Sequence, residues 1–200
     1  MVHRIRGLLL ALLMGGLLIC PVYAASSFPD VDEYAECAEA VEYVSEAGIM
    51  VGDENGNFNP YKTVTRAEMA TLICRVLGET ENLAEDNSLF TDVPASHWAN
   101  KYIVKAALLG VINGYGNKIY GPSDNVTYEQ AVTMIVRAIG KESETSGRGG
   151  YPEGFLAIAE EDGLLNGVFS ANGEYLSRAD IATILFNYYN GWAPMDGYDS

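Results

Sequence analysis

The sequence is poor in histidine, cysteine and basic residues. It contains 2 His, 3 Cys and 12 Lys and Arg among 200 residues, against 27 Asp and Glu, so its formal net charge is −15. This acidic field would repel phosphates, which disfavours nucleic acid as a partner. An anionic ligand would have to be held by a few local cations. Apart from His3 near the N-terminus, His97 is the only histidine, and no Ser or Cys has an evident base partner, so we expect no enzyme.

A long apolar run occurs at the N-terminus, over residues 7–19, and it is too short for a comfortable membrane span. Basic residues precede it and small residues follow it, as in a secretory signal peptide. We predict a signal peptide over residues 1–24. A lipoprotein signal with Cys20 as the lipidated residue is the alternative, disfavoured by the bulky Ile19 before it. Cleavage after Ala24 removes two arginines and no acid, which leaves 10 basic and 27 acidic residues and a charge of −17. No membrane partner is expected afterwards.

Cysteine is scarce in the remaining chain, where only Cys37 and Cys74 are left. Both fall on apolar helix positions of one repeat, so we expect two buried free thiols, with a bridge within that repeat as the alternative. Without a nearby histidine they predict no zinc site. Residues 53–57 resemble a calcium loop, but Phe58 stands where that loop needs glycine and Val64 where it needs glutamate. We therefore expect a turn there, and neither metal nor cofactor.

Three repeats organise the chain. Phe28-Pro29-Asp30-Val31 reappears as Phe90-Thr91-Asp92-Val93, and Gly48-Ile49 as Gly110-Val111, each 62 positions later. A third, more divergent copy has Gly163-Leu164 at the equivalent position. We predict repeats at 28–79, 90–141 and 146–190, followed by a loose tail over 191–200.

Each repeat has the pattern helix, loop, helix, so the predicted fold class is all-α. Apolar spacing and turn residues predict helices at about 35–47, 66–77, 97–109, 128–139, 152–162 and 178–189, with Ser96 as the N-cap of the third. No single pair of such helices can bury its apolar side alone. The second helix of each repeat is the more continuously apolar, so we expect these three to form a shared core with the first helices outside.

The motif Thr65-Arg66-Ala67-Glu68 opens one of these core helices. Thr65 and Glu68 predict a capping box, in which each side chain accepts a hydrogen bond from a backbone N–H of the helix start. Thr127 with Gln130 and Ser177 with Asp180 repeat the arrangement.

An arginine follows two of the three caps, as Arg66 and Arg178, whereas Tyr128 follows the other. A cation in the first turn opposes the helix dipole, at about 0.3–1 kcal/mol. Capping does not explain why an arginine stands there. Two explanations are open: the arginine binds a ligand, or it forms a salt bridge between repeats. Arg75 and Arg137 lie late in their helices, where a cation suits the dipole, and we expect them to be structural.

The order of these motifs resembles the S-layer homology family of bacterial cell-surface modules. The resemblance rests on the opening Phe90-x-Asp92-Val93, on Trp98-Ala99, on Gly48-Ile49 and on Thr65-Arg66-Ala67-Glu68, and it covers residues 28 to about 190. It implies a pseudo-threefold spindle around a three-helix core. It also implies binding of secondary cell-wall polysaccharide, often carrying pyruvate ketals, in grooves between repeats.

Carried over residue by residue, the resemblance implies that Arg66 and Arg178 hold an anionic sugar. A guanidinium fork together with helix N-terminal N–H groups would match a carboxylate. Tyr128 stands where the third arginine would be, so fewer than three grooves are expected to work.

The same resemblance makes Asp30, Asp92 and Trp98 candidates for the groove wall. Asp30 and Asp92 could instead brace a turn, and Trp98 could instead belong to the core. Glu36 takes the Trp98 position in the first repeat, and Tyr151 takes it in the third.

The expected function is that of a secreted module at the bacterial cell wall or cell surface (the S-layer), attached non-covalently to an anionic glycan. Two alternatives are open. A helical-repeat adaptor would bind a surface protein through an exposed apolar patch, and a wall-active enzyme would use paired carboxylates that nothing in the sequence singles out.

Overall fold

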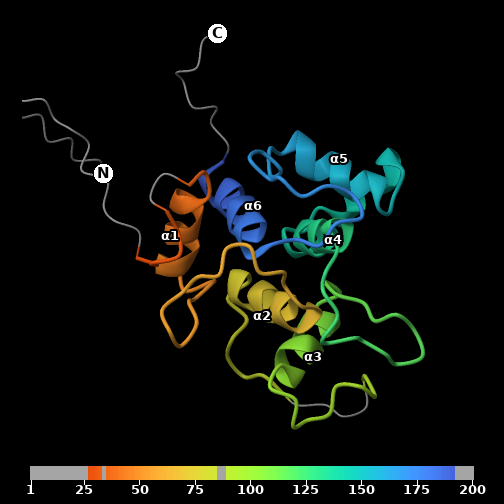
Figure 1. Cartoon of the computed structure of the whole chain (residues 1–200). Helices are drawn as coiled ribbons and strands as arrows, with labels where there is room; N and C mark the ends of the chain where they lie inside the picture. Colours follow the sequence, from red (N-terminus) through yellow and green to blue (C-terminus); the bar gives the residue numbers. More distant parts are fainter. Residues whose placement is uncertain (1–26, 33–34, 85–88, 192–200) are drawn as a thin grey trace, which may run out of the picture.

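The computed structural model describes residues 27–32, 35–84 and 89–191, and within these ranges the fold is all-α, as predicted (Figure 1). The helices are α1 Ala38–Glu46, α2 Arg66–Val76, α3 Asn100–Leu108, α4 Tyr128–Ala138, α5 Glu153–Glu161 and α6 Arg178–Asn190, with short 3₁₀ turns η1 Glu142–Glu144 and η2 Ser146–Arg148. The predicted signal peptide and the tail beyond residue 191 lie outside the described residues. Of the described helices, none has the length and apolar character needed to span a bilayer.

The three core helices begin where the capping boxes predict. In α2 the Thr65 side chain accepts from the Glu68 backbone N–H, and the Glu68 carboxylate accepts from the Thr65 N–H. Thr127 with Gln130 and Ser177 with Asp180 make the same reciprocal pair. Each box satisfies two backbone donors that the helix cannot pair internally.

The outer helices begin later than predicted. The expected N-cap of α3, Ser96, is wrong: the helix starts at Asn100, with Ala99 as its N-cap. The Ala99 N–H donates to Nδ1 of His97, and the His97 N–H donates to the Pro94 carbonyl, so a hydrogen-bonded turn occupies the predicted first turn. Similarly, α1 starts at Ala38, and neither N-cap residue offers a side-chain cap.

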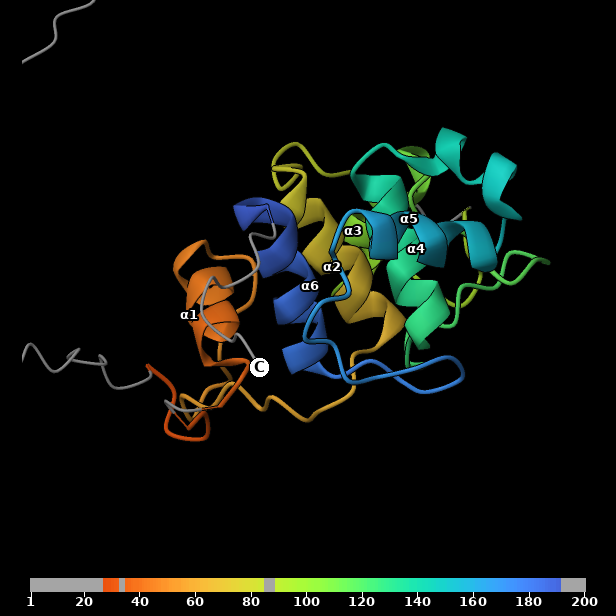
Figure 2. The ribbon, with the colours of Figure 1, turned by 90° about the horizontal axis from the view of Figure 1, so that it is seen from above.

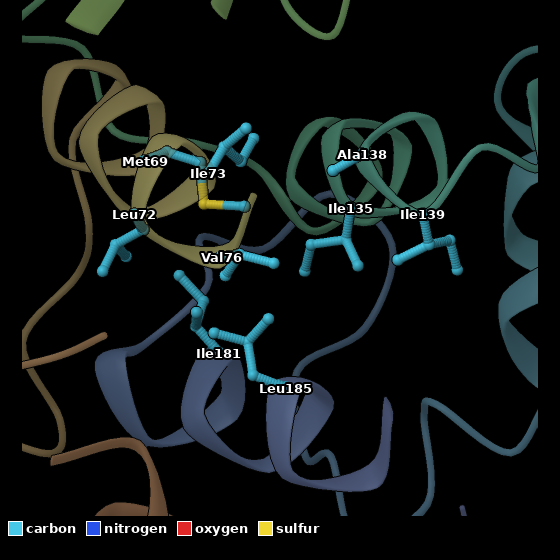
Figure 3. Close-up of a pocket in the computed structure, with 9 residues that line it drawn as sticks. All are labelled: Met69, Leu72, Ile73, Val76, Ile135, Ala138, Ile139, Ile181 and Leu185. Carbon is cyan, nitrogen blue, oxygen red and sulfur yellow. The ribbon is translucent and has the colours of Figure 1, made fainter. Parts of the chain in front are cut away.

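The second helices of the three repeats share the core, as expected. Apolar side chains from α2, α4 and α6 point toward one another around a gap of about 10 Å³ (Figure 3). The residues around it are Met69, Leu72, Ile73, Val76, Ile135, Ala138, Ile139, Ile181 and Leu185. The gap is no larger than one water needs, so the three helices are tightly packed.

Each outer helix packs on a core helix of a different repeat. The close pairs are α1 with α6, α3 with α2, and α5 with α4, and the members of each pair are neighbours in Figure 1, while Figure 2 shows α1 beside α6 from above. The first helix of each repeat thus covers the second helix of the repeat before it, and α1 covers that of the last repeat. This cyclic order is what a pseudo-threefold spindle requires; the symmetry itself stays a prediction.

Both described cysteines are free thiols, as expected, rather than a bridge. Cys74 is fully buried, and burial raises the pKa of its thiol to about 11. Cys37 is only partly buried at the start of α1.

Truncation of a core side chain should test the shared core. Ile181 is fully buried between the core helices, so Ile181→Ala should lower the free energy of unfolding by about 2–5 kcal/mol. Leu108→Ala, on the exposed end of α3, should change it by less than about 0.5 kcal/mol. Urea unfolding followed by circular dichroism measures both. Equal losses would contradict the packing described here.

Candidate functional site

Arg66 inserts its side chain into the loop of the following repeat. Its Nε donates to the Tyr120 carbonyl at 2.8 Å and its Nη2 to the Asn113 carbonyl at 2.6 Å. The guanidinium lies against the rings of Tyr115 and Tyr120, at 4.5 and 4.4 Å from their centroids, and Arg66 is only 3% exposed. The open question of a salt bridge between repeats is thereby answered: the contact joins two repeats, but its partners are backbone carbonyls.

Arg178 makes the same contact from the third repeat to the first. Its Nε donates to the Phe58 carbonyl at 2.7 Å and its Nη2 to the Val51 carbonyl at 2.8 Å, with the Phe58 ring 4.6 Å away. Phe58 and Val51 lie 62 positions before Tyr120 and Asn113. We call each such contact an arginine brace. Burial lowers the pKa of Arg178, while the carboxylates of nearby acids oppose that shift.

The helix N-terminal donors are not available to an anion, which corrects the expectation from sequence. In α2 the Arg66 N–H donates to the Asp124 carbonyl at 2.8 Å and the Ala67 N–H to the Pro122 carbonyl at 3.0 Å. The next N–H, that of Glu68, belongs to the capping box. The start of α6 is paired in the same way, with the carbonyls of Lys62 and Pro60. Neighbouring repeats therefore satisfy these groups themselves.

Tyr128 leaves the remaining junction without a brace. Its backbone N–H donates to the Glu174 carbonyl at 2.8 Å, as at the other two junctions, but its ring is buried and supplies no cation. Burial raises the pKa of its phenol, and nearby carboxylates raise it further. The neighbouring Glu129 links the repeats instead, by accepting from the Gly173 N–H at 2.7 Å.

Asp30 and Asp92 hold the loops that receive the braces. Asp92 accepts from the Tyr120 N–H at 2.9 Å and the Gly121 N–H at 2.7 Å. Asp30 accepts from the N–H groups of Phe58 and the next residue, at 2.8 and 2.7 Å. The bracing alternative is thus observed for both. Burial of Asp92 would raise its pKa, but these hydrogen bonds and the charge of Arg66 bring it below its ordinary value.

Trp98 lies at the surface, so its alternative as a core residue is wrong. It is 59% exposed just before α3, with its ring stacked beside that of His97 at 5.9 Å. Tyr151 has the equivalent place before α5 and the same exposure of 59%. Both rings are therefore accessible to a ligand.

An open groove lies where the third repeat meets the first. Its volume is about 470 Å³, in the range of small-molecule sites. It is lined by Ala35, Glu36, Cys37, Tyr61, Phe169, Ser177, Ala179 and Asp180. Sequence reasoning missed Tyr61 and Phe169, which are 85% and 75% exposed. Neither residue belongs to a repeated motif. The one feature of the sequence that could have indicated them is an aromatic residue in a turn-rich loop.

Loss of a brace should destabilise the fold. Arg66→Met removes two charge-assisted hydrogen bonds and leaves two carbonyls without a donor, so the free energy of unfolding should fall by about 3–6 kcal/mol. Arg148→Met is the matched control, because Arg148 pairs with Glu161 at the surface and should matter little. Chemical unfolding of both variants measures the difference. If neither variant loses stability, or if both lose the same amount, the stabilising role of the brace is refuted.

The capping carboxylates should make stability fall in acid. Burial of Asp180 would raise its pKa, but hydrogen bonds from Ser177, Ser170 and the Phe169 N–H bring it below the ordinary value. A lowered folded pKa gives stability that is complete above the unfolded pKa of about 3.9 and is lost as pH falls through the folded pKa. Asp180→Asn should lower stability at neutral pH and flatten the acid dependence below about pH 4. An unchanged slope in unfolding experiments across that window would contradict this account.

The comparisons with known proteins agree with the repeat pattern. The model of the S-layer homology domain matches residues 27–70 and 89–132. The chain is similar to a cell surface protein of Thermoanaerobacter kivui, with 36% identity over 81% of this chain and 21% of that protein. It is also similar to the middle cell wall protein of Brevibacillus brevis, with 32% identity over 82% of this chain and 15% of that protein.

A cellulosome-anchoring protein of Acetivibrio thermocellus matches at 30% identity over 56% of this chain and 26% of its own length. The chain thus spans about a quarter or less of each of these relatives. The third repeat lies beyond the two stretches that the family model matches, and it is supported by its own capping box and brace. The chain belongs to the S-layer homology domain family.

Proposed function

We propose that this protein is a non-enzymatic module at the bacterial cell surface that attaches non-covalently to the cell wall by binding secondary cell-wall polysaccharide. The family match supports this, as do relatives that are named cell surface, cell wall and cellulosome-anchoring proteins. One further relative is an amylopullulanase, but the match covers only 6% of its length, so its activity is not carried over.

The observation that carries the proposal is that open surface with exposed rings lies at the junctions between repeats. The groove of about 470 Å³ has two such rings, and Trp98 and Tyr151 stand before the outer helices at the other two junctions. The apolar face of a sugar ring packs on an aromatic face, and its hydroxyls then reach the polar rim. A polysaccharide can engage several junctions at once, which raises its overall affinity.

An anionic group of the polymer, such as a pyruvate ketal, would meet the one guanidinium nitrogen that each brace leaves over. Within the described residues, Nη1 of Arg66 and of Arg178 makes no hydrogen bond. Arg178 is partly exposed, whereas Arg66 is only 3% exposed. Each brace uses two of the five N–H donors of its guanidinium, which leaves the two N–H groups of Nη1 for a charge-assisted bond to the anion.

Other candidate residues have supporting roles in this proposal. Asp30 and Asp92 fix the loops against which the arginines are held, and Trp98 supplies a stacking platform. Tyr128 brings no cation, so we expect its junction to bind the anionic unit weakly or not at all.

Retention on purified wall sacculi tests the proposal. The protein should sediment with intact sacculi and stay in solution after the polysaccharide has been extracted from them. Trp98→Ala should weaken retention about tenfold, since it removes an exposed ring without touching the core. Leu108→Ala, which changes an exposed apolar residue at the far end of α3, is the matched control and should bind normally.

Equal retention on intact and extracted sacculi would refute glycan recognition. Retention by a surface protein in place of the glycan would favour the adaptor, and hydrolysis of wall fragments would favour the enzyme.

A further inference from the structure

The groove between the third and first repeats differs in composition from the other junctions. The residue before the outer helix is an exposed aromatic in the second and third repeats, Trp98 and Tyr151, but it is Glu36 in the first. Aromatic surface comes instead from Tyr61 and Phe169, which belong to the two loops that border the groove. This junction therefore keeps stacking surface and gains a carboxylate.

The two acids that line the groove, Asp180 and Glu36, differ in whether their carboxylate oxygens accept hydrogen bonds from the protein. Asp180 is buried, and both its oxygens are occupied: Oδ1 accepts from the Phe169 N–H, and Oδ2 accepts from the hydroxyls of Ser170 and Ser177. Glu36 is exposed, and within the described residues it makes no hydrogen bond or ion pair. One carboxylate is thus free to meet a ligand.

Among the described residues that line this groove there is no lysine or arginine. Arg178, on the same helix as Asp180, turns its guanidinium to the carbonyls of Phe58 and Val51. A carboxylate-bearing sugar would therefore face Glu36 and Asp180 without a compensating cation. The like charges would repel each other. An ammonium group would be attracted, and the acidic charge of the whole chain would add to that attraction.

We propose that the groove between the third and first repeats binds a sugar unit with a free amino group, a hexosamine that is not N-acetylated. Its ammonium pairs with Glu36 in a charge-assisted contact, and its ring lies against Tyr61 or Phe169. The inference rests on the proposed function, because it assigns this unit to one groove of a polysaccharide-binding module. The anionic units are then left to the arginine braces.

Cys37 provides a built-in reporter for this groove. It lines the groove and is partly buried, whereas Cys74 is fully buried in α2. Burial raises the pKa of the Cys37 thiol, and the charges of Asp180 and Glu36 add to the shift, so a reagent that reacts in mild acid is needed. A pyridyl disulfide reagent at about pH 6 meets this need and keeps a sugar amine protonated.

The experiment measures how fast Cys37 is modified in the full chain, read at that residue by peptide mass spectrometry. Three tetrasaccharide probes are compared: chitosan, with free amines; chitin, with acetylated amines; and oligogalacturonate, with carboxylates. Chitosan should slow the modification at concentrations about three- to tenfold below those that chitin requires, and oligogalacturonate should have no effect. Glu36→Gln should abolish the preference for chitosan. Glu39→Gln, another exposed glutamate near the start of α1, should keep it.

Protection by oligogalacturonate equal to that by chitosan would overturn the inference, as would a Glu36→Gln variant with an unchanged preference. Sacculus retention, measured on the same preparation, separates this result from the proposed function. A protein retained by its polysaccharide but unprotected by chitosan refutes the inference alone. A protein protected by chitosan but not retained refutes the proposed function and supports the chemistry of the groove.

Discussion

The structure depends on a guanidinium group that crosses from one repeat into the loop of the next. Taken within its own helix, Arg66 is misplaced, because a cation in the first turn costs about 0.3–1 kcal/mol against the helix dipole. Its two hydrogen bonds to carbonyls of the next repeat are charge-assisted and mostly buried, and each contributes about 1.5–3 kcal/mol. The contact between repeats therefore outweighs the local penalty, which explains why the same arginine returns as Arg178.

The braces act together with an exchange of helices. Each outer helix covers a core helix that belongs to another repeat, and the first turn of each core helix donates its N–H groups to the loop of another repeat. A single repeat would expose its core helix and leave those donors unpaired. The folded unit is therefore the whole set of repeats, and the junctions between them are formed as part of folding.

The junctions combine rigid and open parts, as the proposed ligand binding requires. Carboxylates such as Asp92 and Asp180 are saturated by hydrogen bonds and fix the loops. Rings such as Trp98 and Tyr61 are largely exposed to solvent. A rigid frame with accessible rings loses little conformational entropy when a glycan binds. The three junctions also differ from one another. Arg66 braces the first repeat to the second, Tyr128 takes the place of the arginine between the second and third, and the junction of the third with the first combines the Arg178 brace with Glu36 before its outer helix.

The sequence by itself determined the repeats, the all-α class, the starts of α2, α4 and α6, and the three helices of the core. These follow from local chemistry, since a capping box and an apolar stripe act within a few turns of one helix. It did not determine what Arg66 and Arg178 contact, because their carbonyl partners lie in another repeat and carry no residue-type signal. Only the tertiary structure decided that Trp98 is exposed, that the helix N-terminal donors are taken, and that Tyr61, Phe169 and Glu36 line one groove. Those facts depend on how the repeats pack against one another. Contacts between residues that are far apart in the sequence leave no periodic pattern in it.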